Sequence, residues 1–169
     1  MKIALIGFMA TGKTTVGKIL SKKTNMKLHE TDNLIEKNSG KTIQDIFAQE
    51  GEDKFRKIEH QALNECIKED NIIISCGGGI TTFSENVRLL NKNCFTVLLN
   101  ASPEEIFQRV KQDETRPLLN FDNRLDRIKY LIGKRKEQYE KAADAIINTE
   151  GLSPEQIADK IVNLINLKD

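Results

Sequence analysis

The chain has 169 residues, of which 38% are hydrophobic and 30% are charged, and its formal net charge is +1. This composition excludes a disordered chain, and the length suffices for one α/β domain with a real core but not for two of ordinary size. The balanced charge provides no general field for nucleic acid, and no apolar stretch approaches the roughly 20 residues that span a bilayer. We therefore expect one domain over residues 1–169 that binds neither nucleic acid nor a membrane.

Short apolar runs alternate with longer amphipathic stretches along the chain. The predicted strands cover residues 3–6, 27–29, 72–75, 95–99 and 145–147, of which the second is the weakest. The predicted helices cover residues 13–24, a region from 32 to 68, 84–91, 104–111, 124–143 and 155–167. Alternation of this kind predicts a three-layer α/β/α fold, in which a parallel sheet is covered by helices on both faces.

Local signals mark two helix starts and one long loop. The runs Ser102–Glu105 and Ser153–Gln156 each offer a serine N-cap, a proline at the first helical position, and Glu or Gln three residues after the cap. Residues 112–123, in contrast, are rich in Asp, Asn, Thr and Pro around the sequence Arg-Pro-Leu-Leu. A polar loop of this length within a compact domain is more often a functional lid than filler.

The cysteines and histidines indicate the compartment rather than a metal site. Cys66, Cys76 and Cys94 are odd in number and widely spaced, so neither a disulfide framework nor a CxxC site is expected. His29 and His60 have no partner at metal-ligand spacing, and we expect both to be structural or solvent-facing. Since a strand pattern begins almost at the first residue, no signal peptide is expected. We expect a cytoplasmic protein and, without a sustained exposed apolar stripe, a monomer.

The most informative motif runs from Gly7 to Thr14, Gly-Phe-Met-Ala-Thr-Gly-Lys-Thr, which matches GxxxxGK[ST] and follows an apolar strand. A strand that enters such a loop and opens a helix directs backbone N–H groups and the positive end of the helix dipole at a phosphate. Lys13 can reach the outer phosphates of a nucleotide, and the hydroxyl of Thr14 can ligate Mg²⁺. The motif predicts binding of a nucleoside triphosphate. The loop residues expected to bind it are Ala10, Thr11, Gly12, Lys13, Thr14 and Thr15.

Two further clusters follow predicted strands, where open α/β sheets bind ligands. Glu30, Thr31 and Asp32 form the first. A carboxylate there can orient an acceptor hydroxyl or hold Mg²⁺ through water, although Thr31 and Asp32 equally suit a helix N-cap. The second is the run Gly77–Gly79, which allows a close approach of the backbone to a ligand or forms a tight loop without one. The sequence alone leaves both pairs of alternatives open.

Several arginines stand out in a chain that otherwise prefers lysine, and arginine suits bidentate recognition of a carboxylate or a phosphate. Arg56 follows Phe55 and precedes Glu59, while Arg116 belongs to the lid-like run. Arg135 lies four residues before a tyrosine, on the same face of a predicted helix. These arginines are candidates for contacts with an anionic substrate.

In this order and spacing the motifs resemble the shikimate kinase family over nearly the whole chain. The matching residues are Gly7 to Thr15, Thr31 and Asp32, Gly51 and Glu52, Phe55 and Arg56, Glu59, Gly77 to Gly79, Arg109, Arg116 to Leu119, Arg135 and Tyr139. The P-loop alone is shared by many families, but this combination is far more specific. The resemblance implies a nucleoside-monophosphate-kinase-like fold with a five-stranded parallel sheet, a substrate-binding region over residues 32–60 and a lid over residues 112–123.

The resemblance also implies an activity, the transfer of the γ-phosphate of ATP to the 3-hydroxyl of shikimate in aromatic amino-acid biosynthesis, with Mg²⁺ as cofactor. By position, Asp32 would hold the substrate hydroxyls and act as an orienting group or general base. Lys13 would follow the β- and γ-phosphates, Thr14 would ligate Mg²⁺, and Arg116 would close with the lid over the transferring phosphate. These residues are the expected catalytic and metal-binding set.

For binding, the resemblance implies that Arg56 and Arg135 clamp the substrate carboxylate while the Gly77–Gly79 backbone completes the pocket, and that Arg109 lies against adenine. Two positions depart from the family pattern. Glu30 replaces the more common Asp, which could shift coordination of Mg²⁺ through water. Ala10 and its neighbour Thr11 replace the more usual Gly with a small residue, for which we expect little loss.

Three alternatives remain in view. A related small-molecule kinase of the gluconate or nucleotide kinase type shares the fold and the phosphate loop, but Phe55-Arg56 and the Arg-Pro of the lid argue against it. A GTPase would need Asn-Lys-x-Asp after a strand, whereas Asn91-Lys92-Asn93 is followed by cysteine and precedes a strand. A binding protein that has lost catalysis would not be expected to keep the whole candidate set.

Overall fold

The computed structural model describes residues 1–111 and 123–166. Five parallel strands form one sheet in the order β2-β3-β1-β4-β5. The strands are β1 (Lys2–Ile6), β2 (Lys27–Glu30), β3 (Ile72–Ser75), β4 (Phe95–Asn100) and β5 (Ala145–Asn148). The helices are α1 (Lys13–Thr24), α2 (Thr31–Ser39), α3 (Ile43–Ile67), the 3₁₀ turn η1 (Ile80–Thr82), α4 (Ser84–Asn93), α5 (Pro103–Val110), α6 (Arg124–Ala142) and α7 (Pro154–Asn166). The predicted fold class is confirmed.

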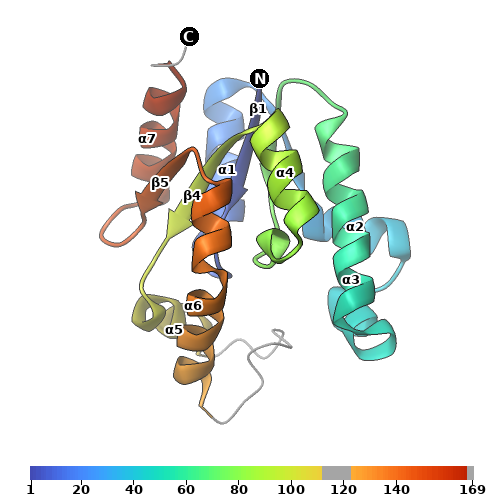
Figure 1. The fold of residues 1–169 in the computed structure, drawn as a ribbon. Coiled ribbons are helices and arrows are strands. Elements are labelled where there is room, and N and C mark those ends of the chain that lie inside the picture. Colours follow the sequence, from blue (N-terminus) through green and yellow to red (C-terminus); the bar gives the residue numbers. More distant parts are fainter. Residues whose placement is uncertain (112–122, 167–169) are drawn as a thin grey trace.

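Helices cover both faces of the sheet, and each face has its own core. Figure 1 shows α4 and α6 in front of the sheet and α1 behind it. Ile3, Leu5 and Ile73 point to the face that α1 and α7 cover, whereas Ala4, Ile6, Ile72 and Ile74 point to the other. Since successive side chains of a strand alternate between faces and both faces are covered, the buried positions of β1 and β3 are apolar except for Ser75 at the end of β3. The sheet is therefore a rigid platform whose strand ends position the site.

The region from residue 32 to 68 divides into two helices, which the sequence pattern did not separate. Gly40 ends α2 in the left-handed region, at φ 67°, and its N–H donates to the carbonyl of Glu36. The side chain of Thr42 then caps α3 by accepting from the N–H of Asp45. Within α3, Gly51 has the non-helical angles φ 80° and ψ 172°, so the helix is kinked there. The kink turns the segment before Gly51 relative to the longer segment after it.

The two predicted serine caps differ in one respect. At α7 the box is reciprocal, because Gln156 N–H donates to Ser153 Oγ and Ser153 N–H donates to Gln156 Oε1. At α5 the hydroxyl of Ser102 accepts from Glu105 N–H, but the backbone N–H of Ser102 donates to a carboxylate beyond β5. Both helices nevertheless start where the sequence placed them.

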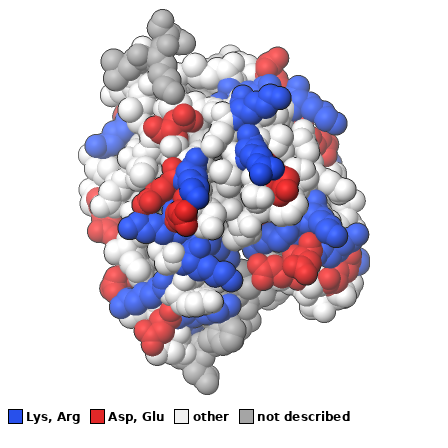
Figure 2. All heavy atoms as spheres, viewed as in Figure 1, with Lys and Arg blue, Asp and Glu red and all other residues white. Residues whose placement is uncertain are grey.

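The remaining expectations concern the surface and the loop. Within the described residues, no helix is long and apolar enough to cross a membrane. Figure 2 shows Lys and Arg interspersed with Asp and Glu over the viewed face. Residues 112–122, which carry almost all of the predicted lid and include Arg116, lie outside the described residues. Asn123, the last residue of the predicted lid, is the N-cap of α6.

Candidate active site

The phosphate loop joins β1 to α1, and its glycines occupy conformations that other residues reach only under strain. Gly7 has φ 140°, and a Cβ at this position would lie 2.3 Å from the carbonyl oxygen of Leu99. Gly12 has φ 93° and is the N-cap of α1, which no side chain caps. The first-turn N–H groups of α1 therefore point into the loop, as anion binding at a helix N-terminus requires.

Lys13 lies across this loop and is only 8% exposed. Its ammonium group donates to the carbonyl oxygens of Gly7 at 2.9 Å and Phe8 at 2.8 Å. Thr11 Oγ1 also donates to the carbonyl of Phe8. These contacts hold a positive charge inside the loop, where the outer phosphates of a nucleotide would lie.

The phosphate loop forms one wall of a cavity of about 200 Å³, which we call the phosphate cavity. Glu30 and Asp32 face the loop across it, and Thr14 Oγ1 donates a hydrogen bond of 2.8 Å to Glu30 Oε2. The longer side chain of Glu30 thus reaches Thr14 directly. Neither Thr31 nor Asp32 caps α2, whose N-cap is Glu30 without a side-chain hydrogen bond. The alternative of a simple helix cap for these two residues is therefore wrong.

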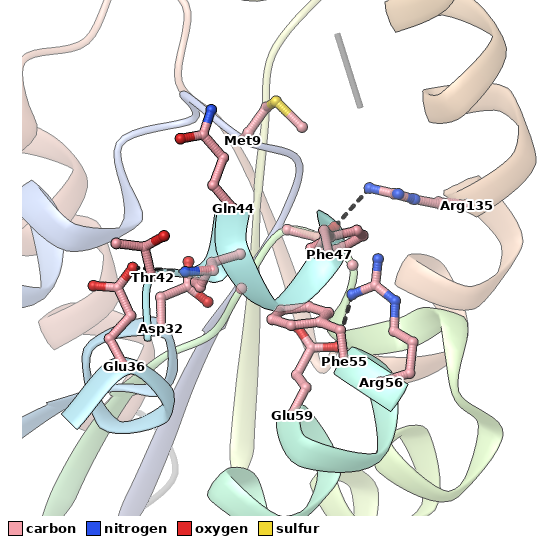
Figure 3. Close-up of a pocket in the computed structure, with 14 residues that line it drawn as sticks. Met9, Asp32, Glu36, Thr42, Gln44, Phe47, Phe55, Arg56, Glu59 and Arg135 are labelled. Carbon is pink, nitrogen blue, oxygen red and sulfur yellow. Dashed lines mark hydrogen bonds and ion pairs between the residues drawn. The ribbon is translucent and has the colours of Figure 1, made fainter. Parts of the chain in front are cut away.

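A second cavity of about 330 Å³, the substrate cavity, adjoins the first and shares Met9, Asp32 and Gly78 with it. Figure 3 shows Asp32 on one side of this cavity and the guanidinium groups of Arg56 and Arg135 on the other. The rings of Phe47 and Phe55 lie between these groups, 4.5 Å apart at their centroids. The cavity thus combines cations at one end, the carboxylates of Asp32 and Glu36 at the other and an apolar floor.

Arg56 is held by two carboxylates of its own helix. Its Nη1 lies 2.8 Å from Glu59 Oε2 and its Nη2 lies 3.0 Å from Glu52 Oε1. Burial disfavours the charged guanidinium, but the attraction of Glu59 and Glu52 outweighs it and raises the pKa of Arg56. For Glu59, burial disfavours the charged carboxylate and so raises its pKa. The attraction of Arg56 offsets this loss of hydration only in part.

The glycines after β3 bring the backbone against these side chains. A Cβ at Gly77 would lie 2.7 Å from an oxygen of Asp32 and 2.7 Å from one of Glu59, and a Cβ at Gly79 would lie 2.3 Å from Arg56 Nη1. Any side chain larger than hydrogen would push these groups apart. The N–H of Gly77 also donates to Thr31 Oγ1 at 2.9 Å, which ties the turn to the start of α2.

Gly78 supplies the acceptor that positions the second arginine. Its carbonyl oxygen accepts from Arg135 Nη1 at 3.1 Å and from the hydroxyl of Tyr139. These residues are four apart on α6 and share one helix face, as their spacing predicted, and the structure brings both to the same carbonyl oxygen. The Arg135 guanidinium also lies 5.5 Å from the centroid of the Phe8 ring. The side chain is thereby fixed at the edge of the substrate cavity.

Arg109 lies at the outer side of the phosphate loop. Its Nη1 donates to the carbonyl of Ala10 at 2.9 Å, and Glu105 accepts from the same guanidinium one helical turn earlier. This places Arg109 beside the residues predicted to bind the nucleotide. Arg116, predicted to act with the lid, lies outside the described residues.

The model of the family described as "SKI: Shikimate kinase" matches residues 9–166. The chain belongs to the shikimate kinase family. Among curated members, those of Thermodesulfovibrio yellowstonii and Caldicellulosiruptor saccharolyticus are each 44% identical to the chain, covering 95% and 99% of it and 92% and 96% of their own lengths.

Solved structures of the family agree with this assignment. Shikimate kinase from Acinetobacter baumannii in complex with shikimate superposes with a TM-score of 0.96 at 33% identity, covering 99% of this chain and 94% of that one. A deoxyadenosine kinase from M. mycoides, at 20% identity and a TM-score of 0.64, shows the wider nucleotide-kinase-like fold alone. As a family member the chain is an ATP-dependent kinase, and the gluconate or nucleotide kinase alternative is not supported.

The structure adds residues that the site prediction did not include. Four residues matched the family pattern but were given no role from the sequence, namely Glu52, Glu59, Thr31 and Tyr139. The signal available for Glu59 was its place three residues after a buried arginine, where an ion pair on one helix is expected. No local pattern indicated that Thr31 would hold Gly77, 46 residues away.

Proposed function

We propose that the chain transfers the γ-phosphate of ATP to the 3-hydroxyl of shikimate, giving shikimate 3-phosphate and ADP. The observation that carries the proposal is the position of Asp32, which lines both the phosphate cavity and the substrate cavity. An acceptor hydroxyl from one cavity and a phosphate from the other would meet beside this carboxylate. Membership of the shikimate kinase family supports the same substrate.

The substrate cavity has the charges that a compact hydroxylated carboxylate requires. Arg56 and Arg135 present guanidinium groups to one end, where they would form charge-assisted bonds with a carboxylate. Asp32 at the other end accepts hydrogen bonds from hydroxyl groups, and a neutral sugar would gain nothing from the two cations. The acceptor hydroxyl would thereby point at the phosphate cavity, and positioning of this kind supplies much of the catalysis in phosphoryl transfer.

We assign to Asp32 the orientation of this hydroxyl and the acceptance of its proton, and to Lys13 the stabilisation of charge on the β- and γ-phosphates. We assign to Arg109 a contact with adenine and to Arg116 closure over the transferring phosphate. We also propose that residues 1–169 form one kinase domain, in which residues 32–60 bind the substrate and residues 112–123 form a lid.

The residues present fit a magnesium ion bound together with ATP. Thr14 Oγ1 and Glu30 Oε2 both line the phosphate cavity and lie 2.8 Å apart. Mg²⁺ prefers oxygen ligands, several of which are usually water molecules. Within residues 1–111 and 123–166 there is no group of three His, Cys, Asp or Glu side chains that would hold a metal alone. We propose that Thr14 holds the ion directly and that Glu30 and Asp32 hold it through water. When bound, Mg²⁺ neutralises charge on the transferring phosphoryl group.

We further propose that the protein acts as a monomer in the cytoplasm. The phosphate loop, Asp32 and both arginines of the two cavities come from the same chain. The three cysteines are unpaired. Sedimentation velocity at assay concentration tests the oligomeric state, and a stable dimer would contradict it.

The function is tested by a coupled assay of ADP release with MgATP. Shikimate, gluconate, nucleoside monophosphates and no acceptor are compared under the same conditions. Turnover with shikimate alone is the expected result. ADP release with another acceptor would move the chain to a different substrate class, and ATP binding without turnover on any acceptor would indicate a binding protein.

The role of Asp32 is tested by Asp32→Asn, which keeps the shape but removes the charge. We expect kcat to fall by about 10²–10⁴-fold, because general base catalysis is lost, with little change in ATP affinity. Turnover and titration of ATP binding are measured on the same preparation. Near-normal kcat in this variant would exclude Asp32 as the base.

A further inference from the structure

Helix α3 contacts the Gly77–Gly79 turn through Arg56 and Glu59, and His60 lies one helical turn after Arg56. Arg56 and His60 lie four residues apart and so share a face of α3. Arg56 packs directly on the turn, since a Cβ at Gly79 would lie 2.3 Å from its Nη1. His60 does not line the substrate cavity and is half-buried between α3 and α4. Its contacts connect α3 to the same turn by a different route.

The imidazole of His60 is held on three sides. Nδ1 lies 2.7 Å from Asn86 Oδ1, and Nε2 lies 3.2 Å from the amide nitrogen of Asn64 on the solvent side. The ring meets the Phe83 ring edge to face, with centroids 5.3 Å apart and an interplanar angle of 74°. The orientation of His60 is therefore determined by its surroundings.

Asn86 carries the connection onward. It is fully buried at 0% exposure, and its amide nitrogen donates to the carbonyl of Ile80 at 2.9 Å. Because the nitrogen faces Ile80, the amide oxygen must face His60, so His60 donates from Nδ1 and accepts at Nε2. Loss of this donor would leave a buried amide oxygen without a partner, which is more costly than loss of an exposed hydrogen bond.

Ile80 is in turn bonded to the glycines. Its N–H donates to the carbonyl of Gly77 at 3.1 Å, and Thr82 donates to the carbonyl of Gly79 from its N–H at 2.9 Å and from its hydroxyl at 2.7 Å. The carbonyl of Gly78, between them, is the acceptor for Arg135. A displacement of Ile80 would therefore move the backbone that positions Arg135.

We propose that His60, acting through Asn86, is a positioning residue for the carboxylate end of the substrate cavity. It fixes α3, which carries Arg56, against the glycine turn, which holds Arg135, and so sets the spacing of the two guanidinium groups. The proposal rests on the proposed function, because the two arginines are its carboxylate site. His60 is more than the structural or solvent-facing residue that the sequence indicated, although it lines neither the substrate cavity nor the phosphate cavity.

The test compares two amides at position 60. In His60→Asn the side-chain nitrogen takes approximately the place of Nδ1 and keeps the donor to Asn86, whereas in His60→Gln the nitrogen extends toward the place of Nε2. Loss of a hydrogen bond to a buried acceptor corresponds to about a 5- to 10-fold rise in KM for shikimate in His60→Gln. We expect kcat and KM for ATP to stay within about twofold of wild type, and His60→Asn to recover most of the shikimate affinity.

Asn64→Ala is the matched control, since it removes the exposed partner of the same ring. We expect it to leave all constants near those of wild type, because water replaces an exposed hydrogen bond. Thermal unfolding of each variant shows which fraction is folded at the assay temperature. His60→Ala, measured in the same way, gives the effect of removing the ring entirely.

The outcomes separate the two proposals. An unchanged KM for shikimate in folded His60→Gln would overturn the positioning role. Equal losses of shikimate and ATP affinity, or equal effects of the Asn and Gln variants, would show that His60 only stabilises the fold. Either result would also overturn the positioning role. Failure of the wild-type protein to phosphorylate shikimate would instead overturn the proposed function.

Discussion

The two arginines of the substrate cavity differ in what their removal would leave behind. Arg56 neutralises Glu59, which is fully buried, whereas Arg135 bonds to the uncharged carbonyl of Gly78. Removing one partner of a buried ion pair leaves a charge without compensation, which is strongly destabilising. Two residues with the same proposed role in binding should therefore have different effects on the stability of the fold.

We expect Arg56→Ala to lower the free energy of unfolding by about 2–4 kcal/mol at pH 8 and by less at pH 5. The pKa of Glu59 is already raised and would rise further without Arg56, so a larger fraction of the carboxyl is protonated at the lower pH and its burial costs less. Denaturant unfolding at the two pH values measures the difference. A loss that is equal at both would contradict the explanation.

Arg135→Ala serves as the comparison. We expect it to raise KM for shikimate at least as much as Arg56→Ala does. The corresponding loss of binding free energy is about 2–5 kcal/mol if the ion pair between the guanidinium group and the substrate carboxylate is well desolvated. The loss of folding stability should be smaller than in Arg56→Ala. Kinetics and unfolding of the two variants are measured together. An unchanged KM for shikimate in either variant would remove that arginine from the proposed carboxylate site.

Ala10 is a residue under backbone strain in the phosphate loop. It has φ 61°, in the left-handed region that glycine occupies without cost. We expect Ala10→Gly to raise the free energy of unfolding by about 1 kcal/mol, with nucleotide binding preserved. Ala48→Gly on the exposed face of α3 is the control and should lower stability by about 1 kcal/mol. The same sign for both variants would contradict the strain.

At the scale of elements, the kink in α3 decides where the first part of that helix lies. Gly51 has φ 80° and ψ 172°, a region that essentially only glycine occupies. The segment before it brings Phe47 to the substrate cavity, while the segment after it brings Phe55 and Arg56. The shape of the cavity therefore depends on one backbone conformation.

We expect Gly51→Ala to lower the free energy of unfolding by about 1–3 kcal/mol and to raise KM for shikimate. Gly133→Ala is the matched control, because Gly133 lies within α6 with nothing within 4 Å of a Cβ placed there. That change should raise stability by about 0.5–1 kcal/mol, since alanine loses less backbone freedom on forming a helix. A stabilising effect of Gly51→Ala would exclude the kink as a requirement of the fold.

At the scale of the whole molecule, buried thiols make stability depend on alkaline pH. Burial raises the pKa of Cys66 and of Cys94 from the ordinary 9.0 to about 11, and it raises the pKa of Cys76 as well. The folded state then retains these protons after the unfolded chain has released them. Their contribution to stability is therefore complete below pH 9 and decreases as the pH rises toward 11.

We expect the free energy of unfolding to fall by about 1–2 kcal/mol for each of Cys66 and Cys94 between pH 8 and pH 10.5. Guanidinium unfolding under reducing conditions at a series of pH values measures the slope. The variant Cys66→Ala/Cys94→Ala should show a shallower decline than wild type. Equal slopes for both proteins would assign the alkaline loss to other groups.

Several parts of the fold were predictable because their signals are local. The apolar strands and the alternation with helices predicted a parallel sheet, and strand ends were correct to within one residue. The serine boxes predicted the starts of α5 and α7. The division of residues 32–68 was not predicted, since Gly40 and Thr42 act through backbone conformation and a single side-chain bond that hydrophobic periodicity does not reveal.

By itself the sequence determined the phosphate loop, the succession of strands and helices along the chain and the family, because each depends on residue types at fixed spacing. Only the tertiary structure decided that Asp32 lies between two cavities. It also decided that the carbonyl of Gly78 accepts from both Arg135 and Tyr139. The link from His60 to the glycine turn through Asn86 is a third contact of this kind. These contacts join residues 26 to 61 positions apart in several cases. They arise from the packing of helices on a common sheet, which no local pattern records.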